Sequence, residues 1–395
     1  MSQDTASRAY RFARGSYLLH LWTLFGLALS NGLLGLAALA TPWAARGNRE
    51  RWRRLAPIAP PLLLYVAALL MAILGSHDPV QSLQALGEVF NLATLVLAPL
   101  LLAGLRQARL AVDGILWGSG AFAVWGLVQF FVLGYGDLDQ RIRGPFSHWM
   151  TFAGLLLLAD FLLIARLTVR SDARRRWFWW ALLVLLNVAL VVSLTRGAWV
   201  ALAITVTALL ALKAPRLLPA YLPAAALFLL LAPAPVVSRV VSIGDLRYPS
   251  NYERLCMLEA GFQMVRQQPL FGVGPDMVDE LYPLYRHPTS QRPRAPHLHN
   301  TFLQLAAERG IVSLAAYLWL MGAILWLAYR GYRRAGPGDV GRAELLLGVL
   351  LGLVAFNCAG LFEDNWGDTE VQRVVLLLAA LPLVLSGSAS EDRAG

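Results

Sequence analysis

Two histidines and an asparagine stand directly before a long apolar run in RAPHLHNTFLQLAAERG, residues 294–310. A neutral imidazole can accept a proton from a hydroxyl group or bind a metal ion, and its neighbours decide between the two roles. A tetrahedral metal site would need further ligands, for which His287 and Glu308 are the nearest candidates. Because the nearby arginines repel a cation, we expect no metal here and assign the chemistry to His299.

A helix is predicted to begin within this stretch. Thr301 and Gln304 have the spacing of a capping box, and Asn300 is the alternative N-cap. His299 then precedes a helix N-terminus, whose dipole disfavours the charged imidazole, as do the neighbouring arginines. We therefore expect His299 to be neutral near pH 7 and able to accept a proton, with His297 as a supporting neighbour. A histidine bonded only to the backbone at the end of the loop is the structural alternative.

Arg196 is the first candidate for binding an anion. It lies in SLTRGAW, a tight turn between two apolar blocks, where a charge is costly unless it is paired or binds an anion. Gly197 is expected to permit this turn and to let a ligand approach the backbone. Arginine suits a bidentate grip on phosphate oxygens, and the alternative is an arginine that reaches lipid phosphates.

Arg254 in NYERLCML and Arg143 in QRIRGPFSHW are the second and third candidates. For Arg254 the alternative is an ion pair with Glu253 or Glu259 on a surface helix, and for Arg143 it is contact with lipid headgroups. Together the three arginines indicate an anionic ligand, either a lipid phosphate or a lipid-linked diphosphate.

The rest of the chain is mostly apolar. Of 395 residues, 57% are hydrophobic and 15% are charged, and the mean hydropathy is +0.56. The apolar residues form blocks of about 17 to 25, the length with which a helix crosses roughly 30 Å of hydrocarbon. We expect an all-α polytopic membrane protein that forms a single integral membrane domain over residues 1–395. The basic residues lie in short loops between blocks, which argues against a nucleic-acid-binding face.

Arginine placement predicts the topology, because short basic loops stay in the cytoplasm. The strongest are RGNRERWRRL (46–55), RLTVRSDARRRW (166–177) and YRGYRRAGPGDVGR (329–342). The apolar stretch before the first of them must then cross twice, as two short helices hinged at Asn31-Gly32. The other spans are expected at 57–75, 89–105, 110–133, 148–166, 177–194, 197–212, 217–232, 301–328, 344–362 and 370–386, which makes about twelve transmembrane helices with both termini in the cytoplasm.

This topology leaves one large loop, residues 233–300, on the outer side, where we expect one or two interfacial helices plus turns. It also brings the three candidate arginines and His299 to that same side. Positive charge there departs from the orientation rule, and an anionic ligand would explain the departure.

The stretch HLHNTFLQLAAERGIVSLAAYLWL resembles the signature of the O-antigen ligase/polymerase superfamily, in which His-x-His-Asn precedes an apolar run and Glu-x-Gly. Three further segments match in order: RIRGPFSHWMTFAG, SLTRGAWVAL and NYERLCMLEAGFQMVRQQPLFGVGP. With about twelve spans and one large loop before the histidines, the resemblance covers most of the chain.

The resemblance implies an inverting, metal-independent glycosyltransferase of the bacterial inner membrane, with a GT-C-like membrane fold, a large periplasmic loop and no cofactor. Such O-antigen ligases transfer polysaccharide from undecaprenyl diphosphate to a sugar hydroxyl of lipid A-core on the periplasmic side, which completes lipopolysaccharide. The family's essential arginines correspond to Arg196 and Arg254, and its histidine corresponds to His299. An acidic position near the C-terminus corresponds to Glu363 or Asp364, and the sequence assigns no role to it.

We expect Arg196 and Arg254 to bind the diphosphate and His299 to orient or deprotonate the acceptor hydroxyl. Further substrate contacts are expected from Arg143, His297 and Asn300. An O-antigen polymerase, which uses two lipid-linked donors, is the nearest alternative, and a protein O-oligosaccharyltransferase is a third relative. A twelve-span transporter is the alternative from another class, because Asp160 lies within a span.

Overall fold

The computed structural model describes residues 3–169, 173–336 and 338–386. Within these ranges the chain forms seventeen α-helices and two short 3₁₀ helices, without any strand, which confirms the predicted all-α class. Eight of the helices are long and apolar enough to cross a membrane, and three shorter apolar helices accompany them. The chain is therefore a multi-pass membrane protein.

Each span predicted after residue 56 coincides with one helix. The first part of the chain forms α1 (Gln3–Trp22), α2 (Leu27–Ala44), α3 (Arg49–Arg53), α4 (Ala59–Leu74), α5 (Pro79–Ser82), η1 (Leu83–Ala85), α6 (Leu86–Leu101), α7 (Gly104–Phe131) and α8 (Trp149–Val169). The second part forms α9 (Ala173–Val192), α10 (Arg196–Lys213), η2 (Pro215–Leu217), α11 (Leu218–Leu231), α12 (Ala234–Val241), α13 (Pro249–Gln267), α14 (Val278–Tyr285), α15 (Thr301–Arg334), α16 (Val340–Ala359) and α17 (Thr369–Ser386).

The predicted hinge at Asn31-Gly32 is wrong, because the chain turns between α1 and α2 at residues 23–26 and both residues lie inside α2. The reason is a contact far along the chain. Arg373 of α17 is fully buried, and its guanidinium donates to Asn31 and, at 2.7 Å, to Ser30. The polar residues of the SNG stretch thus satisfy a buried charge and do not form a turn.

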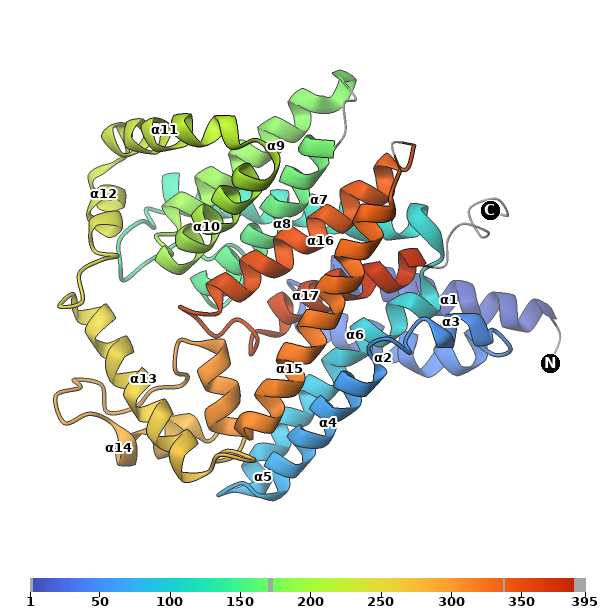
Figure 1. Cartoon of the computed structure of the whole chain (residues 1–395), viewed down its shortest axis with the longest axis horizontal. Helices are drawn as coiled ribbons and strands as arrows, with labels where there is room; N and C mark the ends of the chain where they lie inside the picture. Colours follow the sequence, from blue (N-terminus) through green and yellow to red (C-terminus); the bar gives the residue numbers. More distant parts are fainter. Residues whose placement is uncertain (1–2, 170–172, 337, 387–395) are drawn as a thin grey trace.

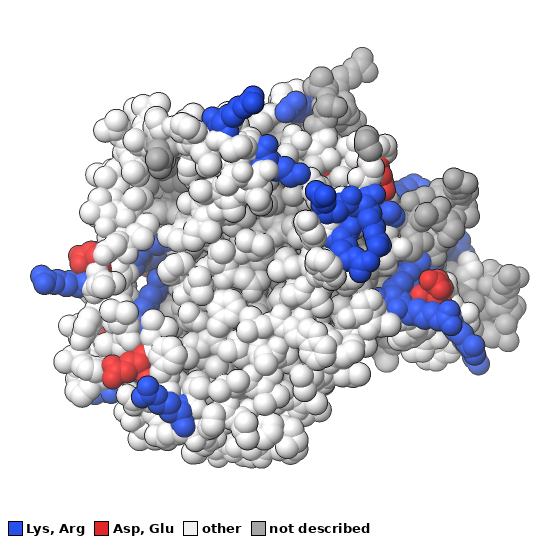
Figure 2. Space-filling model, viewed as in Figure 1, with Lys and Arg blue, Asp and Glu red and all other residues white. Residues whose placement is uncertain are grey.

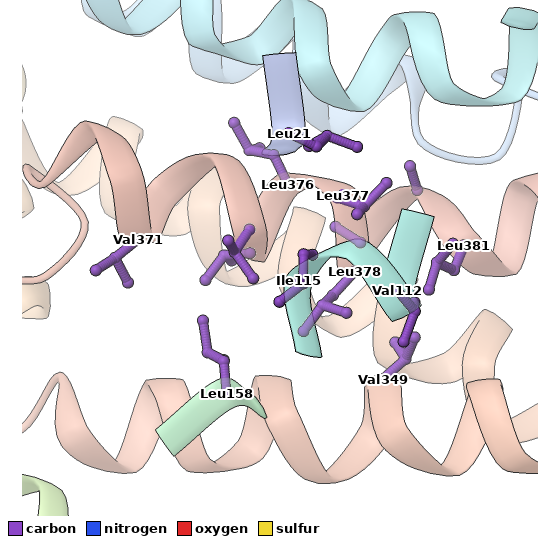
Figure 3. Packing of buried hydrophobic residues seen from close by; sticks show 14 of the residues in the cluster. Leu21, Val112, Ile115, Leu158, Val349, Val371, Leu376, Leu377, Leu378 and Leu381 are labelled. Carbon is purple, nitrogen blue, oxygen red and sulfur yellow. The ribbon is translucent and has the colours of Figure 1, made fainter. Parts of the chain in front are cut away.

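Helices α8, α16 and α17 form the centre of the bundle (Figure 1). Residues 371–385 of α17 are all buried. Gly348 and Gly352 of α16 let neighbouring helices approach closely, since a β-carbon at Gly348 would lie 2.9 Å from Leu162 of α8. Figure 3 shows leucines of α17 meeting side chains from four other helices: Leu21 of α1, Val112 and Ile115 of α7, Leu158 of α8 and Val349 of α16.

Charged side chains are absent from the middle of the face drawn in Figure 2. Figure 2 shows a broad uncharged band, with Lys and Arg gathered at one margin around α3 and the ends of α15 and α16. A few charges lie at the opposite margin, near α12 to α14. This distribution is the one expected of a bundle whose middle lies in hydrocarbon, and the basic stretches 46–55 and 329–336 share the more basic end.

The large loop 233–300 holds three helices, α12, α13 and α14, where one or two were predicted. Helix α13 covers most of the NYERLCMLEAGFQMVRQQ stretch and packs on the first part of α15 through a small apolar cluster that includes Met257, Ala260 and Leu303. The loop is therefore joined to the helix that follows the histidines.

Helix α15 is kinked at Gly310, whose φ is 78°. The kink frees backbone groups, and residues of the large loop bind them. The amide of Val273 donates to the carbonyl of Ala307 at 2.8 Å, and the amide of Ile311 donates to the carbonyl of Pro269 at 2.8 Å. These bonds fix the first part of α15, and with it the histidine stretch, against the large loop.

We predict that Gly310→Ala destabilises the protein by about 2 kcal/mol, because an L-residue is strained at this φ and a β-carbon would lie 2.0 Å from the carbonyl oxygen of Leu270. Thermal unfolding in detergent measures the effect. Gly322→Ala in the same helix is the matched control, since a β-carbon there meets nothing within 4 Å. Equal midpoints for the two variants would contradict the assigned role of the kink.

Candidate functional site

Four arginines line one cleft on the side of the molecule that carries the large loop. Arg141 comes from the loop before α8, Arg196 is the first residue of α10, Arg239 lies on α12 and Arg254 on α13. The acidic residue lining this cleft is Glu363, from the loop 360–368 between α16 and α17. We call this site the arginine cleft. Four positive charges against one negative charge favour an anionic ligand.

Arg196 is buried and is held by neutral partners. Its guanidinium donates to the carbonyl oxygen of Ser242 at 2.9 Å, to Oγ of Ser250 at 2.8 Å and to Oδ1 of Asn251 at 2.6 Å. The guanidinium carbon lies 5.3 Å from the centre of the Tyr248 ring. These bonds fix the position of Arg196. Because no carboxylate among the described residues pairs with it, its positive charge is available to an anionic ligand.

The prediction that Gly197 permits the turn before α10 is wrong. Leu194 adopts the left-handed conformation with φ 55°, and Thr195 follows as the N-cap of α10. Gly197 instead admits Phe362, because a β-carbon at Gly197 would lie 3.2 Å from the β-carbon of Phe362. The glycine therefore permits the loop 360–368 to lie against the start of α10.

Arg254 does not pair with Glu253 or Glu259 on its own helix. Its guanidinium lies 3.6 Å from Oε2 of Glu363, while Glu253 accepts from Oγ of Ser290 at 2.8 Å. In place of the alternative surface ion pair, Arg254 forms one inside the site, which joins α13 to the loop 360–368.

Arg143 lies outside the arginine cleft. It is exposed and donates to the carbonyl of Ser147 at 3.2 Å, whereas Arg141, two residues earlier, lines the cleft. Burial, followed by the positive charges of Arg239 and Arg254, lowers the pKa of Arg141 to about 10. Its Nε is buried without a partner among the described residues. Such a group is stabilised when an anion enters.

His297 and His299 both bind Glu363. Nε2 of His297 lies 2.8 Å from Oε1, and Nδ1 of His299 lies 2.8 Å from Oε2. His299 takes a positive φ of 52°, which directs the chain from the loop into α15. The carboxylate thus touches both histidines and Arg254, and it connects the histidine pair to the arginine cleft. The sequence predicts that His297 is a supporting neighbour of His299. In the structure both rings contact Glu363.

The protonation of this cluster follows from its burial. Desolvation lowers the pKa of His299 despite the attraction of Glu363, so the neutral form predicted from the sequence agrees with the structure, although burial is the main cause. For His297 burial also lowers the pKa, but the nearby carboxylate of Glu363 outweighs it and the net pKa is raised. Burial would raise the pKa of Glu363, and the two histidines hold it well below its usual value.

A divalent metal is the other ligand that these groups suggest. One donor atom each from His297, His299 and Glu363 lies within 4.8 Å of the others. The 2.8 Å contact between Nδ1 of His299 and Oε2 of Glu363 is a direct hydrogen bond, and the arginines of the cleft repel a cation. The arrangement is better suited to holding one histidine in a defined tautomer beside an anion site.

Asn300 has a structural role at the start of α15. Its side chain accepts from the amide of Leu303 at 2.9 Å and donates to the carbonyl of Leu361 at 3.1 Å. The capping box of Thr301 and Gln304 is therefore wrong, and the alternative N-cap, Asn300, is correct. Oγ1 of Thr301 donates instead to the carbonyl of Glu363 at 3.1 Å, which ties the loop 360–368 to α15.

Comparison with known proteins agrees with this geometry. Residues 180–318 match the model of a family described as O-antigen ligase, and this match supports the resemblance of the chain to the O-antigen ligase/polymerase superfamily. The matched part runs from α9 into α15 and includes Arg196, Arg239, Arg254 and both histidines, but neither Arg141 nor Glu363. No curated protein matches the chain. Transfer of glycosyl groups in a membrane is the activity that the family indicates.

We predict that Glu363→Gln lowers the pKa of His297 below its wild-type value, because the carboxylate that stabilises the imidazolium is removed while the burial remains. Titration of ring-labelled histidine by NMR in detergent measures this change. Asp279→Asn, which removes a surface ion pair of 3.5 Å with Arg294, is the control and should leave the titration of His297 unaltered. An unchanged pKa in Glu363→Gln would contradict the described cluster.

Proposed function

We propose that the protein is an O-antigen ligase that transfers polysaccharide from undecaprenyl diphosphate to a sugar hydroxyl of lipid A-core. The observation that carries the proposal is the position of Glu363, which touches Arg254 on one side and His299 on the other. An anion site and a proton acceptor therefore lie next to each other. Transfer of a sugar from a diphosphate to a hydroxyl group requires this pair of functions.

The donor's diphosphate would lie in the arginine cleft. Arg196 and Arg254, together with Arg141 and Arg239, would neutralise the phosphate oxygens and stabilise the charge that grows as the diphosphate leaves. Because Arg196 is held by Ser242, which follows α12, and by Ser250 and Asn251 in the first turn of α13, its position is set before the donor binds. No rearrangement of this arginine is then needed during the reaction.

The transfer step would be a single displacement. The oxygen of the acceptor hydroxyl attacks the anomeric carbon, the bond from that carbon to the diphosphate oxygen breaks, and undecaprenyl diphosphate leaves with the electron pair. The hydroxyl proton passes to Nε2 of His299. Glu363 can only accept a hydrogen bond, so Nδ1 of His299 carries the ring proton and Nε2 presents a free lone pair.

Inversion at the anomeric carbon follows from the single displacement. The leaving diphosphate requires no divalent ion if the arginines neutralise it, and the donor bond itself provides the driving force. We place the site on the periplasmic side of the inner membrane with both termini in the cytoplasm. The proposal rests on the basic margin of Figure 2, opposite the large loop.

We predict that Arg196→Gln and Arg254→Gln each lower the rate of transfer by about 10²–10³-fold, the usual effect of removing a donor that stabilises transition-state charge. His299→Gln should lower it by about 10²–10⁴-fold. Purified enzyme, lipid-linked donor and lipid A-core, assayed in the presence of EDTA, provide the measurement. Arg266→Gln on the exposed part of α13 is the matched control and should retain the wild-type rate. Full activity of Arg196→Gln and His299→Gln would refute the assignment, as would loss of wild-type activity on chelation.

The pH dependence of the rate in the same assay tests whether His299 is the base. Because desolvation lowers the pKa of His299, the rate should rise with an apparent pKa below 6.5 and stay level up to pH 7. Below that pKa the imidazole is protonated and cannot accept the hydroxyl proton. A rate that keeps rising through neutral pH would exclude His299 as the base.

A deletion strain separates the ligase from the polymerase. Loss of every attached repeat from lipid A-core is the expected result for a ligase. Retention of a single attached repeat together with loss of long chains would identify a polymerase instead. Restoration by the wild-type chain but not by His299→Gln is the control that links the result to this site.

A further inference from the structure

The loop 360–368 contributes to two clefts. Its first half, with Phe362 and Glu363, lines the arginine cleft. Its second half, with Trp366 and Gly367, lines another cleft between the start of α2, the start of α6 and the beginning of α17. We call this second site the amide cleft, because its polar lining is mainly amides and carboxylates: Asn31, Gln84, Glu88, Asn91, Asp276 and Gln372.

Two buried N–H donors of the amide cleft have no acceptor among the described residues. They are Nε2 of Gln372, a residue only 2% exposed, and Nε of Arg309, which is 8% exposed. Oε1 of Gln372 accepts from Asn91 at 2.7 Å, so this bond fixes the amide and leaves its nitrogen unpaired. Because unpaired buried donors are costly, these two groups indicate that an oxygen-bearing ligand completes the site.

The charge of the amide cleft excludes a phosphate ligand. Arg309, the arginine that lines it, is already paired with Glu88, and Asp276 adds a carboxylate at the exposed rim. The arginine cleft carries an excess of positive charge, whereas the amide cleft is neutral to negative. A ligand here must offer oxygen atoms without negative charge.

Sugar hydroxyls meet this requirement, because one hydroxyl can accept from an N–H group and donate to a carboxylate or an amide oxygen. Phe90 also lines the cleft and provides an apolar surface for the C–H face of a sugar ring. The mixture of convergent polar groups and one aromatic face is typical of a site for a neutral, hydroxyl-rich ligand.

We infer that the amide cleft binds an uncharged sugar ring of the acceptor glycan. The inference rests on the proposed function. The first sugar of the donor is bonded to the diphosphate and so must lie by the arginine cleft, while the amide cleft lies along the other half of the same loop. Gln372 and Arg309 donate to the sugar oxygens, and Asp276 accepts from a hydroxyl.

The test blocks the amide cleft without disturbing the fold. Gly87 of α6 lines the cleft, and a β-carbon added there meets nothing within 4 Å. Gly87→Trp should therefore fill the cleft and weaken binding of delipidated core oligosaccharide at least tenfold, as measured by saturation-transfer NMR on detergent-solubilised protein. Gly322→Trp, at another helical glycine with open surroundings, is the matched control and should bind as the wild type does.

A second variant removes one contact only. Asp276 is exposed and has a φ of 60°, which asparagine also tolerates, so Asp276→Asn should keep the backbone unchanged and weaken oligosaccharide binding several-fold. Asp279→Asn on α14 is its control. Unaltered affinity in both Gly87→Trp and Asp276→Asn would overturn the inference.

Two further outcomes matter. One distinguishes a donor sugar from an acceptor sugar, and the other distinguishes failure of the sugar site from failure of the ligase function. Displacement by Gly87→Trp of a polysaccharide fragment from the donor, with no effect on the core oligosaccharide, would assign the cleft to the donor and overturn the inference. If the wild type binds core oligosaccharide in the amide cleft but transfers nothing to lipid A-core, the inference on the sugar site is supported and the proposed ligase function is refuted.

Discussion

The carboxylate of Glu363 is the contact on which the candidate site depends. It lies between the two histidines and Arg254, and it thereby connects the histidine stretch, the large loop and the loop 360–368. A buried carboxylate is unstable without such partners, and a buried histidine pair is equally unstable without an acceptor. Each group thus supplies what the others lack. Through this one side chain the arginine cleft and the histidine pair are neighbours.

Hydropathy and arginine placement were enough to predict the spans after residue 56, since a helix in hydrocarbon must be apolar over a fixed length. The first hairpin was mispredicted for a physical reason. Asn31 and Gly32 have the composition of a turn, but Asn31 serves as a partner for the buried Arg373, which lies 342 residues further along the chain. No local pattern distinguishes a polar residue that ends a helix from one that neutralises a distant charge inside a bundle.

Most of the candidate site could be predicted from the membrane topology. Arg196, Arg254 and His299 were placed on one side by counting crossings, and the structure brings the three segments together around Glu363. Arg141 and Arg143 stand in the same stretch, and Arg143 was chosen as the candidate, because only the direction of each side chain decides which one enters the cleft. Arg239 was overlooked, although an arginine within the outer loop breaks the orientation rule as clearly as Arg254 does. The partner of the histidines is 64 residues from His299, and only the fold reveals it.

The position of Glu363 between the last two helices also bears on how the protein is made. The loop 360–368 reaches the arginine cleft only after α16 and α17 have both entered the membrane, and α17 follows every other element of the fold. A nascent chain that has inserted α1 to α15 already holds all four arginines of the cleft and both histidines, yet the carboxylate of Glu363 is absent. A chain that stops before residue 363 therefore lacks the carboxylate that joins its two histidines to Arg254.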